Sequence, residues 1–565
     1  MSLCYSLRQV MKNGYSLALL RKDIVSGMTV GVVAIPLGMA LAIAIGVPPQ
    51  HGLYTVIVAG FLVALFGGSR FNITGPTAAF VVILLPITEH FGLSGLLVAT
   101  MMSGMWLALM GMLKLGRVIR FVPYPVTIGF TAGIGFVIAF LQLKDLLGLT
   151  LMSSPIHFFD KVFSYVNALP SINYADAVIG LLTIVSFIMW SKVCSKVPPH
   201  VMALLVATVL AAIINNSSWA MATTIGDKFH YVIDGVFGRG IPQQLPELSL
   251  PWQDIELSWG LIYQLLPASI AIALLGAIES LLCAVVADGM TKTRHDSDSE
   301  LVAQGLGNMI APLFGAIPAT AAIARTATNI RAGGVSPISA MIHAVFVLIA
   351  MLILAPVLAY IPMAGLAGLL MMVAWNMSEA PHFVKLIKTA PRRDVIVLLV
   401  CFSLTVAFDM VVAVAVGIAL AGVLFIQRVL ALTAAHSTVP ADIEHESMVY
   451  HYLEGPLFFA ACDKIKQLVD DTPKSAQVII FDMEKVTAID ISALNAIQEA
   501  MDQLSHARIL VCNLSSELWL KVQRIGWESL PNVTLCESDA QFTHHLSAIR
   551  ADNRVSVSTP SPLSM

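Results

Sequence analysis

The sequence predicts a polytopic α-helical membrane protein that ends in a small α/β domain. Three observations support this prediction. The chain is 57% hydrophobic and only 12% charged, with a mean hydropathy of +0.82, whereas an ordinary soluble domain is about a quarter charged. Apolar runs of helix length recur between Ile24 and Thr433, and the composition becomes polar after Arg428.

The apolar runs predict fourteen membrane segments. A bilayer core about 30 Å thick requires about 20 apolar residues of helix. Twelve runs meet or approach that length: 24–45, 53–68, 92–113, 125–143, 174–192, 200–215, 261–286, 300–315, 336–356, 360–378, 394–410 and 411–430. Two further pieces, 75–88 and 319–330, are too short and too rich in Gly, Pro or Thr to cross alone, and we count them as broken spans.

We divide the chain into four parts by composition. They are a cytoplasmic lead-in (1–23), a transmembrane domain (24–433), an α/β domain (437–552) and a disordered tail (553–565). An even number of spans returns the C-terminus to the side of the N-terminus. Because Lys and Arg gather in short loops, as in Lys292 with Arg294, we expect an inner (plasma) membrane protein with both termini in the cytoplasm.

The α/β domain is predicted from alternating strand-like and helical runs. The strand-like runs are 448–453, 478–481 and 507–512, and a helical run covers 492–504. This alternation over about 110 residues is typical of one small domain.

Composition excludes several function classes. Lys plus Arg (32) nearly balances Asp plus Glu (35), so no basic face for nucleic acid is expected. The cysteines are scattered, without CxxC pairs or histidines at ligand spacing, so we expect no metal site, disulfide framework or cofactor. They are Cys4, Cys194, Cys283, Cys401, Cys462, Cys512 and Cys536. We find no nucleophile and base pair and no phosphate-binding Gly-rich loop, so an enzyme is not expected.

Two stretches about 240 residues apart resemble each other, Gly75–Phe80 and Ile317–Ala322. Each is a small-residue-rich helix start after a Gly-containing approach, and both fall in the two broken spans. Paired interrupted segments indicate a transporter binding site, because the amides of two half-helix N-termini attract an anion. Ordinary helix-start chemistry is the alternative reading. We therefore predict transport of a small anion held between the two half-helices.

Six motifs carry a resemblance to a known family. They are Ile35–Ala40, Gly52–Tyr54, Gly68–Thr77, Gly276–Cys283, Gln304–Asn308 and Ala324–Asn329. With these residues the chain resembles the SulP family of anion transporters, most closely its DauA-type branch of C4-dicarboxylate transporters. The resemblance implies two inverted seven-segment repeats forming core and gate domains, a homodimer, and a C-terminal cytoplasmic STAS domain. It also implies that the core moves relative to the gate.

The predicted substrate site combines hydroxyl donors, small residues at the helix starts, an aromatic wall and one cation. Its candidate residues are Thr74, Gly75, Thr77, Ala78, Phe80, Thr320, Ala321, Ala322, Ile323 and Arg325. Hydroxyl groups and the guanidinium of Arg325 suit carboxylate oxygens. Helix packing is the alternative role for the hydroxyl and aromatic groups, and charge compensation of Glu279 is the alternative for Arg325.

Glu279 is the predicted ion-coupling residue, because an ionisable group in a lipid-compatible run costs about 2.5–3.5 kcal/mol and is a functional candidate by default. Its carboxyl group could carry a proton, bind a cation together with Cys283 one turn on, or form a structural ion pair with Arg325. In the family that the chain resembles, this position lies at the ion-coupling site. Since a thiol is a poor sodium ligand, we expect proton coupling.

Other polar residues receive structural interpretations. Asp288, Glu300 and Asp409 fall near predicted span ends and are interpreted as interfacial or structural, and His343 as a satisfied core histidine. Ser492 follows Asp490 where anti-sigma antagonists carry a phosphorylatable residue, so it is a candidate regulatory site. It is equally a good N-cap for the helix that follows.

The leading hypothesis is proton-coupled uptake of a C4-dicarboxylate such as succinate, fumarate or aspartate, by elevator-like alternating access. Sulfate transport and sodium-coupled bicarbonate transport are the alternatives for substrate. A passive anion channel and a membrane regulator with the STAS domain as its output are alternatives of another class. The expected partners are the anion, a proton, the bilayer, a second copy of the chain and a cytoplasmic protein that binds the STAS domain.

Overall fold

The computed structural model describes residues 3–116, 123–151, 155, 158–193, 197–217, 221–233, 235–408, 410–438 and 448–556. The chain divides into two compact units, Met1–Ala421 and Gly422–Met565. Cys194 and Asp409, both considered above, lie outside the described residues, as does the predicted tail from 557 onward.

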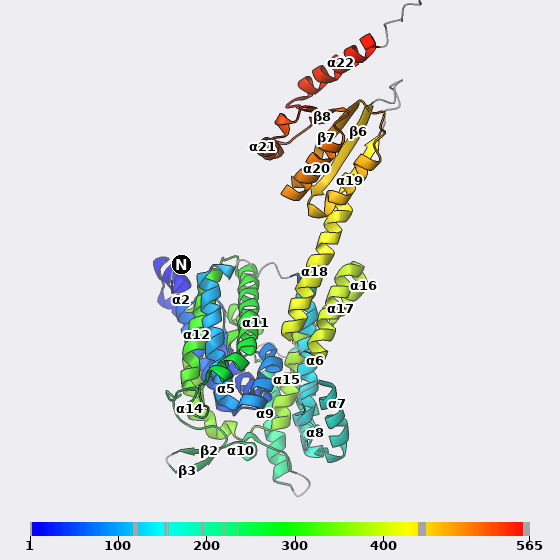
Figure 1. The fold of residues 1–565 in the computed structure, drawn as a ribbon. Coiled ribbons are helices and arrows are strands. Elements are labelled where there is room, and N and C mark those ends of the chain that lie inside the picture. Colours follow the sequence, from blue (N-terminus) through cyan, green and yellow to red (C-terminus); the bar gives the residue numbers. More distant parts are fainter. Residues whose placement is uncertain are drawn as a thin grey trace, which may run out of the picture. The chain divides into compact units, whose positions relative to one another are not determined.

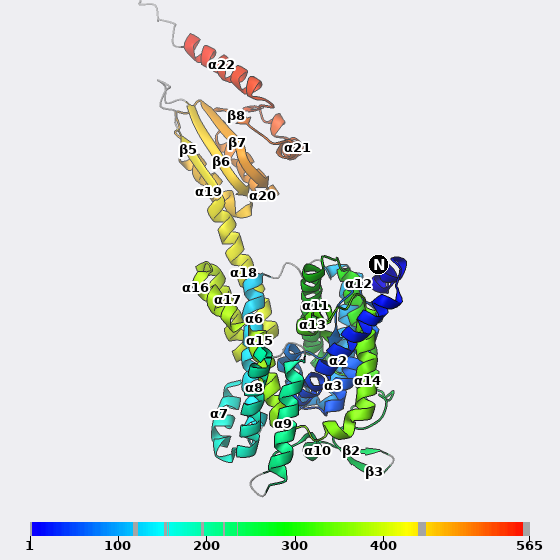
Figure 2. The same cartoon turned by 180° about the vertical axis from the view of Figure 1, so that it is seen from behind.

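The first unit is helical and its membrane helices pack as two groups, seen on opposite sides in Figures 1 and 2. One group contains α2 (Leu17–Ala44), α3 (Pro49–Tyr54), the π-helical turn η1 (Thr55–Ala59), α4 (Gly60–Phe66), α5 (Val81–Met112), α11 (Trp259–Thr291), α12 (Ser297–Ile310), α13 (Ile323–Arg331) and α14 (Ile338–Leu358). The other contains α6 (Tyr124–Leu146), α8 (Tyr174–Val193), α9 (Pro199–Asn215), α15 (Met363–Ser378) and α17 (Arg392–Ala407).

Shorter elements connect these helices. They are α1 (Tyr5–Lys12), α7 (Phe158–Ala168), η4 (Leu169–Ser171), α10 (Ile225–Lys228), η5 (Ala311–Phe314) and α16 (Ala380–Thr389), with a hairpin of β2 (His230–Ile233) and β3 (Val236–Arg239). The last apolar helix is α18 (Met410–Leu432).

Each of the fourteen predicted segments overlaps a helix of the structure. The predicted segments 75–88 and 92–113 share α5, which breaks at Gly92, where φ is 64° and ψ is −168°. Such a backbone conformation suits glycine, which has no Cβ to clash. Among the described residues, eight helical stretches are long and apolar enough to cross a membrane.

The second unit contains a five-stranded sheet in the order β5-β6-β7-β8-β9. Its strands are β5 (Ala434–Thr438), β6 (Met448–Leu457), β7 (Val478–Ile489), β8 (Arg508–Cys512) and β9 (Val533–Leu535). β5 pairs antiparallel to β6, and the other pairs are parallel. The central strands are buried on both faces over 478–481 of β7 and 509–512 of β8, which explains why these stretches are continuous apolar runs rather than alternating ones.

Helices and short turns complete this unit: η6 (Phe459–Ala461), α19 (Cys462–Asp470), α20 (Ile491–Gln503), α21 (Ser516–Ile525), η7 (Trp527–Ser529) and α22 (Asp539–Ser556). The core on one face of the sheet includes Phe481, Ile497 and Trp527. The predicted strands lie in β6, β7 and β8, and the predicted helix is α20. Sequence reasoning missed β5 and β9, and α22 extends past 553, the predicted start of the tail.

His451 of β6 makes the second unit sensitive to acid. Burial lowers its pKa from 6.5 to about 4, and its two ring nitrogens lie 2.9 Å from Ser437 Oγ and 3.0 Å from Thr472 Oγ1. Below pH 6.5 this histidine is protonated in the unfolded chain, but in the folded chain it stays neutral until about pH 4. The contribution of neutral His451 to the free energy of unfolding is therefore fully present above pH 6.5, and about 3 kcal/mol of it is lost as the pH falls toward 4.

We expect hydrogen exchange of the β6 amides in the full-length protein to accelerate between pH 7 and pH 5, after correction for intrinsic exchange. His451→Gln should remove this acid-dependent acceleration. His436→Gln, on the exposed side of the neighbouring strand, should retain it. Equal acid sensitivity in both variants would contradict the assignment.

Candidate functional site

The two echoing stretches meet in space. β1 (Thr74–Gly75) and β4 (Thr320–Ala321) pair antiparallel, with Thr74 opposite Ala321 and Gly75 opposite Thr320. A helical start follows each strand: η2 (Ala78–Phe80) leads into α5, and α13 begins at Ile323. Two half-helix N-termini therefore begin beside one short strand pair, the arrangement predicted for an anion site.

Polar side chains hold the non-helical backbone before α13. The Ala319 carbonyl accepts from Gln304 Nε2 (2.5 Å) and Asn308 Nδ2 (2.9 Å), and the Ala319 amide donates to Asn308 Oδ1 (2.8 Å). Thr55 Oγ1 accepts from the Ile317 amide (2.8 Å) and donates to the Ile317 carbonyl (3.1 Å). These bonds replace the helical bonds that an interrupted span gives up inside the bilayer.

Glu279 lies beside the first half-helix. Its Oε2 accepts a 2.9 Å hydrogen bond from Thr77 Oγ1, and both residues are half-buried. Thr77 immediately precedes the η2 turn. The ionisable carboxyl group of α11 is thus attached to the point where one of the two anion-attracting helix starts begins.

Arg325 is directed to the same strand pair, but it does not form the alternative ion pair with Glu279. Its side chain is only 4% exposed, and Nη2 donates to the Pro76 carbonyl at 2.6 Å. The two charged side chains form no salt bridge. Nη1 is buried without a hydrogen-bond partner among the described residues. The guanidinium therefore keeps a buried, unpaired donor beside the site.

Cys283 contacts a different part of the site from Glu279. Its fully buried thiol donates to Thr326 Oγ1 at 3.1 Å, and the same hydroxyl accepts from the Ile73 amide at 2.9 Å. Cys283 therefore links α11 to the first turn of α13 and to the approach to β1.

The predicted substrate-contact residues differ in how far they are exposed to solvent. Ile323 is 44% exposed, and Thr77 and Ala322 are half-buried. The others are buried: Thr74, Gly75, Ala78, Phe80, Thr320, Ala321 and Arg325. The Ala322 amide donates to the Ile73 carbonyl at 3.0 Å, so that group supports the strand pair.

Two of the buried candidates have structural contacts that argue against direct substrate contact in this conformation. Thr320 Oγ1 lies 2.7 Å from Ser280 Oγ and donates to the Gly276 carbonyl at 3.2 Å. Phe80 is packed against α11, because a Cβ placed on Gly276 would lie 3.6 Å from its ring. Thr74 Oγ1, in contrast, has no hydrogen-bond partner in the described part of the chain.

Ser280 and Glu300 are supporting residues; the role of Ser280 was not predicted, whereas Glu300 was interpreted as interfacial or structural and has the structural role. Ser280 Oγ accepts from the Ala321 amide at 3.3 Å. Glu300 is buried rather than interfacial and accepts from the Gly68 and Ser69 amides, both at 2.9 Å, and from Asn72 at 2.6 Å. It fixes the loop that enters β1.

Two further interpretations are corrected. His343 of α14 is fully buried, yet neither ring nitrogen has a hydrogen-bond partner in the described residues, so it is not a satisfied core histidine. Ser492 is not an N-cap, because α20 begins at Ile491 and Asp490 Oδ1 accepts from the Ala493 amide at 2.8 Å. Ser492 instead occupies the first turn of α20.

Two interrupted helices that meet inside a helical membrane unit define a membrane transport protein. The chain belongs to the sulfate permease family, whose model matches residues 20–401, and residues 440–540 match the STAS domain. YvdB of Bacillus subtilis, which carries the provisional name of a sulfate transporter, is 42% identical over 89% of this chain and 93% of its own length. The bicarbonate transporter BicA of Picosynechococcus sp. is 30% identical over 86% of this chain and 87% of its own length.

Solved structures show the same architecture. The transmembrane domain of a cyanobacterial BicA matches with a TM-score of 0.62 at 29% identity, covering 71% of this chain and 98% of that domain. Murine Slc26a9, an anion transporter in the inward-facing state, matches with a TM-score of 0.80 at 17% identity over 96% of this chain and 94% of its own. The predicted fold class, a multi-helix membrane transporter with a C-terminal STAS domain, is confirmed.

A substitution at Gly75 tests whether Arg325 packs closely against β1. A Cβ at Gly75 would lie 2.5 Å from Nη1, so Gly75→Ala should force the buried guanidinium away and cost about 1–3 kcal/mol. Thermal unfolding of the purified protein measures this change. Gly289→Ala in α11 is the matched control, because nothing lies within 4 Å of its Cβ. Equal melting temperatures would contradict the packing described.

Proposed function

We propose that this protein is a secondary active transporter of a small oxyanion, with Glu279 as the proton-carrying group. The anion binds between the N-termini of η2–α5 and α13. The two helix groups of the membrane unit move relative to one another in an elevator-like manner and expose this site to each side in turn. The observation that supports the proposal best is the hydrogen bond from Thr77 to Glu279 at the start of the first half-helix.

This placement gives a physical reason for coupling. An ionised Glu279 would place a negative charge beside the helix start that attracts the anion, and like charges at short range in a poorly solvated site repel strongly. Protonation removes that repulsion, so proton and anion favour each other's binding. A fixed positive charge on Arg325 holds the anion without itself titrating.

The contacts of Cys283 favour the proton over sodium as the coupling ion. Its thiol is occupied by Thr326, and soft sulfur ligands do not suit hard cations such as sodium. The carboxyl group of Glu279 is therefore the group we assign to coupling.

Sulfate and bicarbonate are the substrates we favour, because relatives similar over most of the chain carry those names. The C4-dicarboxylate prediction, with its DauA-type specificity, rests on motif resemblance alone and remains the alternative. Half-helix amides recognise negative oxygen atoms and accept all three anions. The substrate must accordingly be decided by measurement.

The remaining predictions complete the proposal. We propose an inner-membrane homodimer with cytoplasmic termini, in which the STAS domain, through Ser492, receives regulatory input. A passive channel is disfavoured because a free-running anion pore has no use for a carboxyl group at its anion-attracting helix start. A purely regulatory membrane protein would leave that group equally without a role.

Uptake into proteoliposomes tests the function. We expect labelled sulfate or bicarbonate to accumulate in wild type under an inward proton gradient. One pH unit supplies about 1.4 kcal/mol, or about tenfold accumulation, per coupled proton. Glu279→Gln should lose this accumulation, because an amide cannot carry the proton, while still exchanging substrate without a gradient.

Glu256→Gln, at an exposed position before α11, is the matched control and should accumulate like wild type. Succinate belongs in the same substrate series. Accumulation of succinate alone would replace the favoured substrates and leave the coupling mechanism intact. A sodium gradient that drives uptake equally well in Glu279→Gln would overturn the proton-carrier role.

A further inference from the structure

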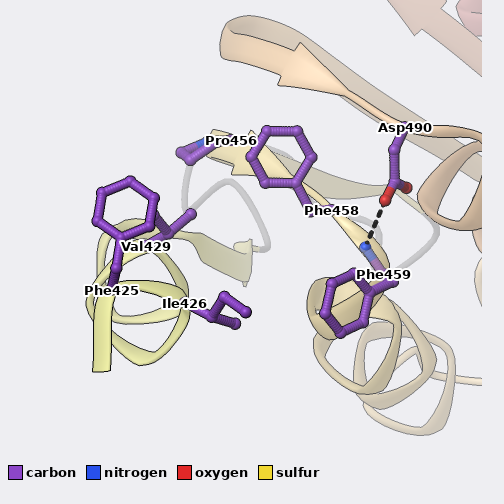
Figure 3. Close-up of a pocket in the computed structure, with 7 residues that line it drawn as sticks. All are labelled: Phe425, Ile426, Val429, Pro456, Phe458, Phe459 and Asp490. Atoms are coloured by element: carbon purple, nitrogen blue, oxygen red, sulfur yellow. Dashed lines mark hydrogen bonds between the residues drawn. The ribbon is translucent and has the colours of Figure 1, made fainter. Parts of the chain in front are cut away.

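An apolar groove of about 280 Å³ opens on the second unit, far along the chain from the anion site. Figure 3 shows Phe425, Ile426 and Val429 of α18 on one side and the residues after β6 on the other. The lining residues are Phe425, Ile426, Val429, Pro456, Phe458, Phe459 and Asp490, all within the second unit. Asp490 is the single charged residue among them.

The aromatic lip of the groove, Phe458 and Phe459, is held open rather than collapsed into the domain. The Phe459 amide donates to Asp490 Oδ2 at 2.8 Å, and the Asp490 amide donates to the Leu457 carbonyl at 3.1 Å. Phe458 is 37% and Phe459 59% exposed, although Leu457, the last residue of β6, is fully buried. Adjacent exposed phenylalanines fixed by a helix cap are costly in water and mark an interaction surface.

The helical side of the groove is fixed to the same domain. Thr433 Oγ1, just beyond α18, donates to the Pro456 carbonyl at 2.7 Å, and Lys464 Nζ donates to the Thr433 carbonyl at 2.5 Å. These bonds join the end of α18 to the segment that carries the aromatic lip. Both sides of the groove are therefore held together by hydrogen bonds within the second unit.

The position of the groove along the chain identifies its occupant. Val412–Val429 is apolar enough to span a membrane, and only 11% of it is buried by the rest of the protein. Phe425, Ile426 and Val429 thus lie in the C-terminal part of this apolar stretch, which the protein itself leaves largely uncovered. A hydrocarbon chain that covers this surface continues directly into the groove.

We propose that the groove binds the acyl chain of a membrane phospholipid, with the chain lying between α18 and the aromatic lip. Aromatic rings at the boundary between hydrocarbon and water are favourable contacts for lipid. Arg428 is exposed one residue before Val429, and Lys and Arg attract lipid phosphates at this depth. The STAS domain thereby gains a contact with the bilayer that is independent of the transported anion.

Photolabelling of the full-length protein tests this proposal. The protein is reconstituted in phosphatidylcholine and phosphatidylglycerol vesicles that contain lipid with a diazirine in the acyl chain, and labelled peptides are identified by mass spectrometry. We expect label on residues 456–461 and 425–429. Phe458→Ser/Phe459→Ser should reduce label on 425–429 about tenfold, because the opposing apolar wall is removed.

Two controls make the result decisive. Leu520→Ser removes an exposed apolar side chain of α21 in the same unit and should leave groove labelling unchanged. Label on α8, which exposes Leu181 and Met189, reports intact insertion in every variant. If α8 is labelled but the groove is not, a second copy or another protein covers it, or it is empty, and the proposal is overturned. Unchanged groove labelling in the double variant overturns it equally.

Discussion

The membrane unit depends on one constraint: backbone amides and carbonyls that leave a helix within the bilayer must find partners inside the protein. The chain leaves helical structure twice at this depth, before η2 and before α13. Pairing β1 with β4 satisfies part of the exposed backbone. Asn308, Gln304 and Thr55 satisfy the approach to β4, and Glu300 satisfies the approach to β1. Without these bonds the two half-helices could not begin in the middle of the unit.

The same constraint separates supporting residues from residues that remain available for chemistry. The hydroxyl groups of Thr320 and Ser280 are hydrogen-bonded to each other and to backbone groups. Thr77 and Glu279, half-buried and bonded to each other, are not committed to the backbone in this way. The proposed binding and release of an anion and a proton needs groups of the second kind, supported by a rigid arrangement of the first.

The sequence was sufficient to predict the helical segments and the meeting of the two half-helices, because hydropathy and the echo of Gly75–Phe80 with Ile317–Ala322 are local signals. It could not predict partners. That Arg325 bonds to Pro76 and not to Glu279, or that Glu300 is buried, depends on which helices pack together. The short edge strands β5 and β9 were missed because a few residues carry too little periodicity to distinguish a strand from a loop.

The arrangement of charges gives the final link between fold and function. Arg325 has one nitrogen fixed on Pro76 and one buried nitrogen without a partner, so an anion that approaches the strand pair finds a preorganised positive group whose position is already determined by folding. Glu279 is not in salt-bridge contact with it. In the proposed mechanism this positive charge is available to the anion, and the protonation state of Glu279 sets how strongly the site attracts it.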